Sequence, residues 1–371
     1  MTPWLESLSR VEALADLELD EALVADMERQ RTPAEIRFHT PGFKAYASSE
    51  IRDCGGNAWP AVSITGNDCA LQCAHCRARV LAGMLPARTP EELWRVANER
   101  IAAGARGMLL SGGSNRRDEI EYGPFCPTLR RIKNAYPNFK IAAHTALVDR
   151  DMAGRLEAAG VDVAMLDIIG AQRTIREVYH LKRGVADFEA ALRAFGETSL
   201  RVVPHIVIGL HFGGFLGERA ALEIVARHRH DALVLVVAMP HYAAPSRPFA
   251  VPDSAEVGRF FMAARRALPD TPLLLGCARP AGRAKQEIDA YAVMAGMSGI
   301  AHPAEGIVEL AARLGHEVSV SPSCCSIAFG DELLSEPSAS IQNIIAQERL
   351  ERAAAGRICG IPVVAAPEAA R

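Results

Sequence analysis

Residues 59–76, WPAVSITGNDCALQCAHC, join a short β-branched run to three closely spaced cysteines. The run at 61–65 predicts a buried strand, because it is apolar, rich in β-branched residues and bounded by a proline and a glycine. Cys69, Cys73 and Cys76 then fall in the loop that follows this strand. The sequence therefore places a set of thiol ligands at the end of a predicted strand.

From this strand onward, strand and helix patterns alternate along the chain. The predicted strands are 61–65, 107–110, 140–144, 162–167, 201–208, 232–239, 272–276 and 298–301. Helical patterns lie between and after them at 90–103, 124–135, 149–159, 185–195, 216–227, 253–267, 283–295 and 303–314. Eight strand–helix units are typical of an α/β protein of the (β/α)8, TIM-barrel type. Strands that are apolar throughout favour a parallel sheet covered on both faces, and a doubly wound open sheet is the alternative.

The barrel is predicted to span residues 59–315, with extensions on both sides. Residues 1–58 form a helical and loop extension, with one amphipathic helix over about 3–30 followed by a Pro/Gly-punctuated stretch. Residues 316–371 form a C-terminal extension, in which 317–321 alternates like a strand and the tail is Ala-rich and helical.

Composition narrows the class of protein. The chain has 371 residues, 49% hydrophobic and 23% charged, which excludes a disordered protein. A net charge of −3 argues against nucleic-acid binding through a basic surface. No apolar run approaches the ~20 residues of a membrane span, and the N-terminus lacks a signal pattern, so we expect a cytoplasmic protein without a membrane partner. In a reducing compartment, nine cysteines favour metal binding or chemistry over disulfides.

In a barrel of this type the active site lies at the carboxyl ends of the strands. Polar and sulfur-containing residues follow several predicted strands at this edge. They are the cysteine triplet, Ser111-Gly112-Gly113-Ser114, His144-Thr145, Asp167, Gly209-Leu210-His211, Cys277-Ala278-Arg279 and His302. We expect them to meet at one rim.

The spacing C-x3-C-x2-C allows three thiolates of one loop to bind a single centre. A zinc ion would usually need a fourth ligand, and His75 lies between ligands, where its ring would point away from the metal. Three cysteines on a four-iron cluster instead leave one iron open to a substrate or cofactor.

This triplet, after the first strand of a barrel, resembles that of the radical S-adenosylmethionine (SAM) superfamily. The resemblance implies a [4Fe-4S] cluster on Cys69, Cys73 and Cys76, with SAM at the open iron. It also implies reductive cleavage of SAM to methionine and a 5′-deoxyadenosyl radical, which takes a hydrogen atom from an unactivated carbon.

The resemblance extends to residues that would bind SAM. His75 would pack against the adenine, in the place of the usual aromatic residue. Ser111, Gly112, Gly113 and Ser114 resemble the GGE-type segment that holds the methionyl amine, although Ser114 replaces its acidic residue. Asp167 would bind a ribose hydroxyl, with a helix cap or rim ion pair as the alternative. Ile208 and Gly209 end a segment similar to the GxIxG type beside adenine, with plain strand core as the alternative.

Other residues near this rim are given plainer interpretations. Arg176 and Tyr179, after the fourth strand, are close enough in sequence to the rim to reach the SAM carboxylate or the substrate, but a solvent-exposed helix face is the favoured interpretation. Cys126 and Cys359 lie in or beside helical segments and are interpreted as structural.

Four more thiols are candidates for a second cluster. Cys54 precedes the first strand, Cys277 ends the seventh, and Cys324 and Cys325 follow the 317–321 strand. Their alternative is that each is a small buried hydrophobic residue. Arg279, two residues after Cys277, is assigned with it to the catalytic residues.

Within the superfamily, the chain is most similar to the biotin synthase-like branch, and there to a component of the archaeal-type two-component lipoyl synthases. The segments that resemble it are 38–43, 59–66, 167–170 and 276–280. Biotin synthases place second-cluster cysteines on early strands, and single-chain lipoyl synthases have an N-terminal C-x4-C-x5-C; both features are missing here.

The resemblance implies sulfur insertion at C6 or C8 of a protein-bound octanoyl chain, with an auxiliary iron–sulfur cluster as sulfur donor. The implied partners are an octanoylated carrier protein or peptide, a second lipoyl synthase subunit, and a flavodoxin or ferredoxin reductant. Two alternatives remain open. One is a radical SAM mutase or cofactor-maturation enzyme with a single cluster. The other is a noncatalytic iron–sulfur electron-transfer or metal-binding protein, which would not cleave SAM.

Overall fold

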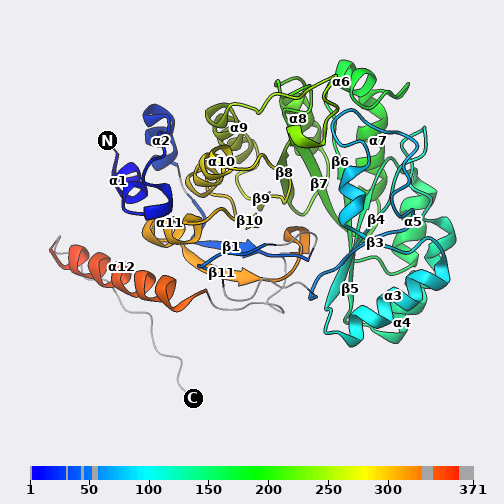
Figure 1. Cartoon of the computed structure of the whole chain (residues 1–371), viewed down its shortest axis with the longest axis horizontal. Helices are drawn as coiled ribbons and strands as arrows, with labels where there is room; N and C mark the ends of the chain where they lie inside the picture. The colour runs from blue at the N-terminus through cyan, green and yellow to red at the C-terminus, as the bar shows by residue number, and fades with distance from the viewer. Residues whose placement is uncertain (1, 31, 43–45, 52–56, 328–336, 359–371) are drawn as a thin grey trace.

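The structure is a computed structural model that describes residues 2–30, 32–42, 46–51, 57–327 and 337–358. Its centre is an 11-stranded parallel sheet that curls into a half-barrel (Figure 1), in the order β11-β1-β10-β9-β8-β7-β6-β5-β4-β2-β3. All eight predicted strands are present and are neighbours in chain order. They are β2 (Ala61–Ser63), β4 (Gly107–Ser111), β5 (Lys140–Thr145), β6 (Val163–Asp167), β7 (Arg201–Ile208), β8 (Leu233–Val237), β9 (Leu273–Leu275) and β10 (Gly299–Ala301). The prediction of a TIM-type α/β fold is confirmed.

Three further strands extend this sheet at its two ends. β3 (Leu85–Pro86) pairs with β2, while β1 (Glu35–His39) lies between β10 and β11 (Glu317–Ser321). The strand at 317–321 was predicted, whereas assigning 35–39 to a loop was wrong. Both extensions therefore contribute strands to the same sheet as the barrel.

Helices cover the outer side of the sheet and also lie in both extensions. They are α1 (Pro3–Ser9), α2 (Glu21–Glu28), α3 (Pro90–Ala102), α4 (Cys126–Ala135), α5 (Arg150–Ala158), α6 (Gln172–Glu177), α7 (Val185–Gly196), α8 (Glu218–Arg227), α9 (Ser254–Ala267), α10 (Arg283–Met294), α11 (Ile307–Arg313) and α12 (Ala339–Ile358). The single helix expected over 3–30 is instead two helices. The second begins at Glu21, directly after Asp20, whose carboxylate caps the helix by accepting a hydrogen bond from Leu23 N.

The strands are apolar because both faces of the sheet are buried. Along β6, Val163 and Met165 pack inside the half-barrel, whereas Ala164 and Leu166 belong to the outer core beneath the helices. The inner cluster includes Trp59, whose ring lies so close to β4 that a Cβ on Gly107 would be 2.1 Å from it. Apolar packing thus fills the half-barrel, and its polar residues lie mainly at the strand ends.

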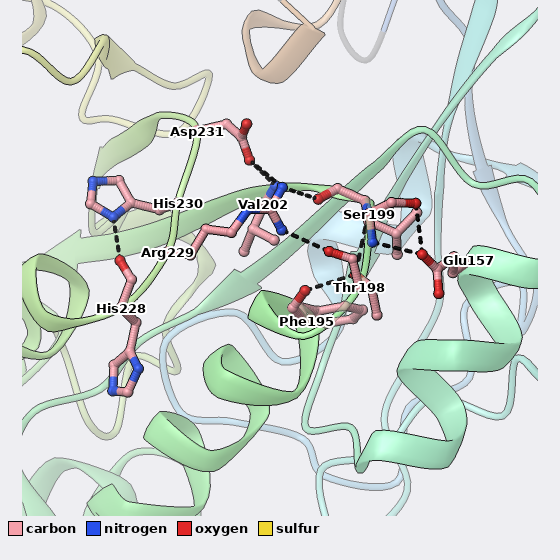
Figure 2. A network of polar contacts seen from close by, with 10 residues as sticks. Glu157, Phe195, Thr198, Ser199, Val202, His228, Arg229, His230 and Asp231 are labelled. Atoms are coloured by element: carbon pink, nitrogen blue, oxygen red, sulfur yellow. Dashed lines mark hydrogen bonds and ion pairs between the residues drawn. The ribbon is translucent and has the colours of Figure 1, made fainter.

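At the amino ends of β7 and β8, a polar network fixes the connecting segments (Figure 2). Glu157 Oε1 accepts hydrogen bonds from the main-chain N and the Oγ of Ser199, both at 2.6 Å. Asp231 accepts from Val202 N at 2.8 Å, and Arg229 donates to two main-chain carbonyl oxygens at 2.9 Å. These groups satisfy one another at the end opposite the cysteine loop, which is where barrel residues serve stability.

In the described part of the chain, no helix has both the length and the apolar character that crossing a bilayer requires.

Candidate active site

The cysteine loop after β2 is held by main-chain bonds to two neighbouring loops. Ala70 N donates to Ser114 O at 2.9 Å, and Ala74 N donates to Val178 O at 2.8 Å. Gln72, Arg77 and Ala78 have φ values of 50°, 49° and 58°. Three non-glycine residues in the left-handed region are unfavourable, and such strain is concentrated at functional sites. The tertiary contacts therefore impose a tight bend around the three cysteines.

The thiols of this first cysteine set (Cys69, Cys73 and Cys76) are close enough to influence one another. A hydrogen bond from Cys73, aided by the neighbouring His75, lowers the pKa of the Cys76 thiol to about 4, while the same bond and burial raise the pKa of Cys73. One thiol is thus a thiolate at neutral pH, the form that binds iron. Among the described residues, no group of three or more Cys, His, Asp or Glu is arranged around a single metal ion. In a four-iron cluster each thiolate binds its own iron, and this donor set fits that arrangement.

The predicted segment Ser111–Ser114 lies directly against the cysteine loop. Gly113 N donates to Thr65 Oγ1 at 2.7 Å, and Cys69 Sγ contacts Ser114 O at 3.7 Å. A Cβ on Gly113 would be 2.0 Å from Asp68 O and 2.6 Å from Cys69 Cα. Only glycine permits this approach, so the structure brings the predicted amine-binding segment to the predicted cluster loop.

Asp167, the predicted ribose contact, ends β6 between two side chains that the sequence did not connect with it. Tyr179 Oη donates to Asp167 Oδ2 at 3.2 Å, and His144 Nε2 lies 3.6 Å from Oδ1. Burial alone would raise the pKa of Asp167, but the hydrogen bond and charge of His144 hold it at about 2. Asp167 is therefore a fixed carboxylate at the mouth of the half-barrel.

Tyr179 also connects Asp167 to the cysteine loop. Its ring stacks on that of His75, with centroids 5.1 Å apart and an interplanar angle of 29°. Placing Tyr179 on a solvent-exposed helix face was wrong, since it is only 5% exposed. Arg176 is exposed, as predicted. Nothing in the local sequence around Tyr179 and His75 indicates that these two residues are in contact.

Two more buried groups complete the polar mouth. Asp118, absent from the predicted site, is 5% exposed and bonds the Ser114 side chain, and burial raises its pKa to about 6. His205 on β7 meets the ring of His144 edge-on at 5.0 Å, and burial and the His144 charge lower the pKa of His205 to about 3.

The predicted adenine-side residues on β7 are fixed by the loop that follows. Ile208 is fully buried, while Gly209 has a φ of +74° and donates its N–H to Glu218 Oε1 at 2.9 Å. Their contact with adenine stays a prediction.

A second cysteine set (Cys277, Cys324 and Cys325) lies inside the half-barrel, with Met165 and Leu274 in the same apolar cluster. Cys324 Sγ lies 3.0 Å from Ser326 Oγ. The hydrogen bond from Cys325 lowers the pKa of Cys324 to about 7, with smaller contributions from Ser326 and the charge of His144.

The structure thus brings together three of the four thiols predicted for a second centre. The charge of Cys277 reaches Cys325, and His144 faces both Cys324 and Asp167. A series of contacts therefore connects the two cysteine sets, since Asp167 bonds Tyr179, whose ring stacks on His75 of the cysteine loop, and also faces His144. Cys54 and Cys359 lie outside the described residues. Cys126 is half-buried, and its Sγ contacts Tyr122 O at 3.5 Å, a purely local contact.

Arg279 does not face this mouth, and assigning it to catalysis was wrong. Its guanidinium forms a fully buried ion pair with both oxygens of Asp289. It also donates to Gly276 O at 2.7 Å and to His302 O at 2.9 Å, and Asp289 accepts from Ala304 N at 2.7 Å. Together these bonds join the turn after β9 to α10, which carries Asp289, and to the turn after β10. Arg279 is thus a clamp for the turn that presents Cys277.

Comparisons with known proteins agree with this geometry. The family model for the radical SAM superfamily matches residues 63–214. The FeFe-hydrogenase maturase HydG from Carboxydothermus hydrogenoformans aligns with a TM-score of 0.53 and 14% identity, over 93% of this chain and 77% of that one. Methylornithine synthase (PylB) aligns with a TM-score of 0.50 and 14% identity, over 94% of this chain and 91% of that one. At such identity the structural likeness establishes the fold alone. No curated protein matches the sequence.

Proposed function

We propose that this protein is a radical SAM enzyme that inserts sulfur into a protein-bound octanoyl chain, and the match of residues 63–214 to the radical SAM family model supports the first part of this proposal. The observation that supports it is the second cysteine set, which packs together inside the half-barrel near His144, the neighbour of Asp167. In a sulfur-inserting enzyme these three thiols would hold the second cluster.

The first cysteine set would hold the cluster, and the Ser111–Ser114 segment, Asp167 and the end of β7 would orient SAM. When bound, the first cluster supplies one electron to SAM, and the second, held by Cys277, Cys324 and Cys325, supplies sulfur. The remaining residues position these groups. Tyr179 and His144 fix Asp167, and Arg279 fixes the Cys277 turn.

The apolar interior also agrees with an acyl substrate. Around the second cysteine set the interior is packed with Val163, Met165, Val234 and Leu274, whose side chains offer no hydrogen-bonding groups. We propose an octanoylated carrier protein or peptide as substrate, a second subunit for the other insertion, and a flavodoxin or ferredoxin as reductant.

The test is the reaction itself. Reconstituted protein, SAM, dithionite and an octanoylated peptide are incubated without oxygen, and the peptide mass is measured. The proposal predicts 5′-deoxyadenosine and a peptide in which sulfur has replaced hydrogen. The Cys324→Ala variant, which keeps the first cysteine set, should still make 5′-deoxyadenosine without the sulfur product. If wild type makes 5′-deoxyadenosine but adds no sulfur to any octanoylated peptide, a one-cluster reaction is the better account.

A further inference from the structure

Five exposed arginines surround the outer side of the cysteine loop. This arginine surface consists of Arg77, Arg79, Arg173, Arg176 and Arg247. They come from three segments far apart in the chain: the cysteine loop itself, α6, and the loop after β8. The protein as a whole has a net charge of −3, so this concentration of positive charge contrasts with the rest of the molecule.

Contacts among the three segments join them into one continuous surface. The cysteine loop is bonded to the segment after α6 by Ala74 N, which donates to Val178 O at 2.8 Å. Arg79 donates to His241 O at 2.8 Å, which joins the cysteine loop to the loop after β8. Arg247 of that loop lies 3.8 Å from Glu177 of α6, so the loop after β8 also contacts α6.

The positive charge of this surface is not neutralised from within. Glu177 is shared by three guanidiniums, at 2.9 Å from Arg173, 3.6 Å from Arg176 and 3.8 Å from Arg247. One carboxylate cannot balance three cations. Exposed ion pairs of this kind add little stability, and the three guanidiniums around Glu177 retain a net positive charge.

The place of the surface distinguishes it from the substrate mouth. Arg77 directly follows Cys76 and is exposed, whereas Asp167 and His144 are partly buried and Cys324 and Cys325 are buried. A partner seated on the arginines would touch the outside of the first cysteine set without entering the half-barrel. Electrons can be delivered from this side while the substrate occupies the other.

We propose that the arginine surface is the docking site for an acidic protein that carries a one-electron redox group. The inference rests on the proposed function, because it assumes a cluster on the first cysteine set. Complementary charge would steer the donor to this loop and raise the rate of encounter, an effect that falls with ionic strength.

The experiment uses the reconstituted full chain and the double variant Arg173→Glu/Arg247→Glu, which leaves the cysteines and the mouth unchanged. Arg95→Glu is the matched control, since Arg95 on α3 is 60% exposed and ion-paired with Glu99 at 2.8 Å. The measurement is the bleaching of the cluster absorbance, by stopped flow, with an excess of an acidic flavodoxin in its reduced form or with dithionite. No SAM or substrate is present, so a carrier protein cannot contribute.

The proposal predicts that the double variant is reduced by flavodoxin roughly tenfold or more slowly than wild type at low salt, and that high salt removes the difference. Reduction by dithionite should stay within about twofold of wild type, and the control should match wild type in both assays. Equal rates with flavodoxin would overturn the proposal, and so would an equal loss with dithionite.

Calorimetric binding of oxidised flavodoxin separates this inference from the proposed function. A protein that binds flavodoxin through the arginines but inserts no sulfur keeps the docking surface and loses only the proposed reaction. If wild type and the double variant bind flavodoxin equally, the docking surface is refuted whatever the reaction.

Discussion

Replacing Gly113 by alanine is expected to separate the segment after β4 from the cysteine loop. The new Cβ would lie 2.0 Å from Asp68 O and 2.6 Å from Cys69 Cα, whereas carbon atoms in good contact are about 3.5–4.0 Å apart. Both obstacles belong to the main chain, so no change of rotamer relieves the overlap and one segment must move by about 1 Å. Overpacking of this kind costs about 1–3 kcal/mol, and the displacement falls directly on a predicted cluster ligand.

The assay is anaerobic reconstitution followed by iron and acid-labile sulfide counts, 5′-deoxyadenosine formation with dithionite, and calorimetric Tm. We expect Gly113→Ala to lose about four irons per chain and SAM cleavage, with Tm lower by a few degrees. Gly154→Ala on α5 is the control, because a Cβ at this position has nothing within 4 Å and lies outside the candidate site. A Gly113→Ala protein with wild-type iron and SAM cleavage would refute the reasoning.

Three other substitutions test the supporting residues. Arg279→Lys should lower the free energy of unfolding by about 2–3 kcal/mol and deplete iron at the second cysteine set. The control is Arg265→Lys, at a buried arginine that bonds only carbonyl oxygens, which should lower stability without losing iron. Equal iron contents in the two variants would contradict the role of Arg279 in holding the turn that carries Cys277. Tyr179→Phe keeps the stack on His75 but loses the bond to the β6 carboxylate, so KM for SAM should rise about two- to tenfold at unchanged iron content; an unchanged KM would exclude this positioning role. Burial raises the pKa of Glu50 to about 7 from 4.5. Between these two pH values the folded protein keeps a proton on Glu50 that the unfolded chain has lost. The free energy of unfolding should therefore fall as pH rises from 4.5 to 7. Glu50→Gln should reduce that slope in urea titrations, and an identical slope would show that Glu50 does not titrate as described.

Local sequence patterns were sufficient to predict most of the strands of the barrel. Each of the eight strands is a short apolar run between turn residues, and such runs need no knowledge of their neighbours to be recognised. β1 could not be found this way. Its five residues lie in a Pro/Gly-rich stretch, and its partners β10 and β11 come more than 250 residues later. The break between α1 and α2 did have a local signal, since Asp20 is a typical helix cap.

The candidate site also contains some residues that local sequence patterns predict and others whose roles only the tertiary structure shows. The first cysteine set and the Gly112-Gly113 pair were identified because their spacing and their place after a strand are local features. The roles of Tyr179, Asp118 and Arg279 depend on tertiary packing, which decides whether a polar side chain is buried with a partner or exposed. Arg279 shows this most clearly, since a cation beside a cysteine on the rim suggested catalysis, whereas its partner Asp289 lies on the following helix.

Iron and acid-labile sulfide, counted per chain after anaerobic reconstitution, test the central claim most directly. Three proteins are compared: wild type, the triple alanine variant of the first cysteine set, and the triple alanine variant of the second. The account predicts about eight irons in wild type and about four in each variant, with SAM cleavage lost only from the first. About four irons in wild type, falling to none in the first variant and unchanged in the second, would contradict it.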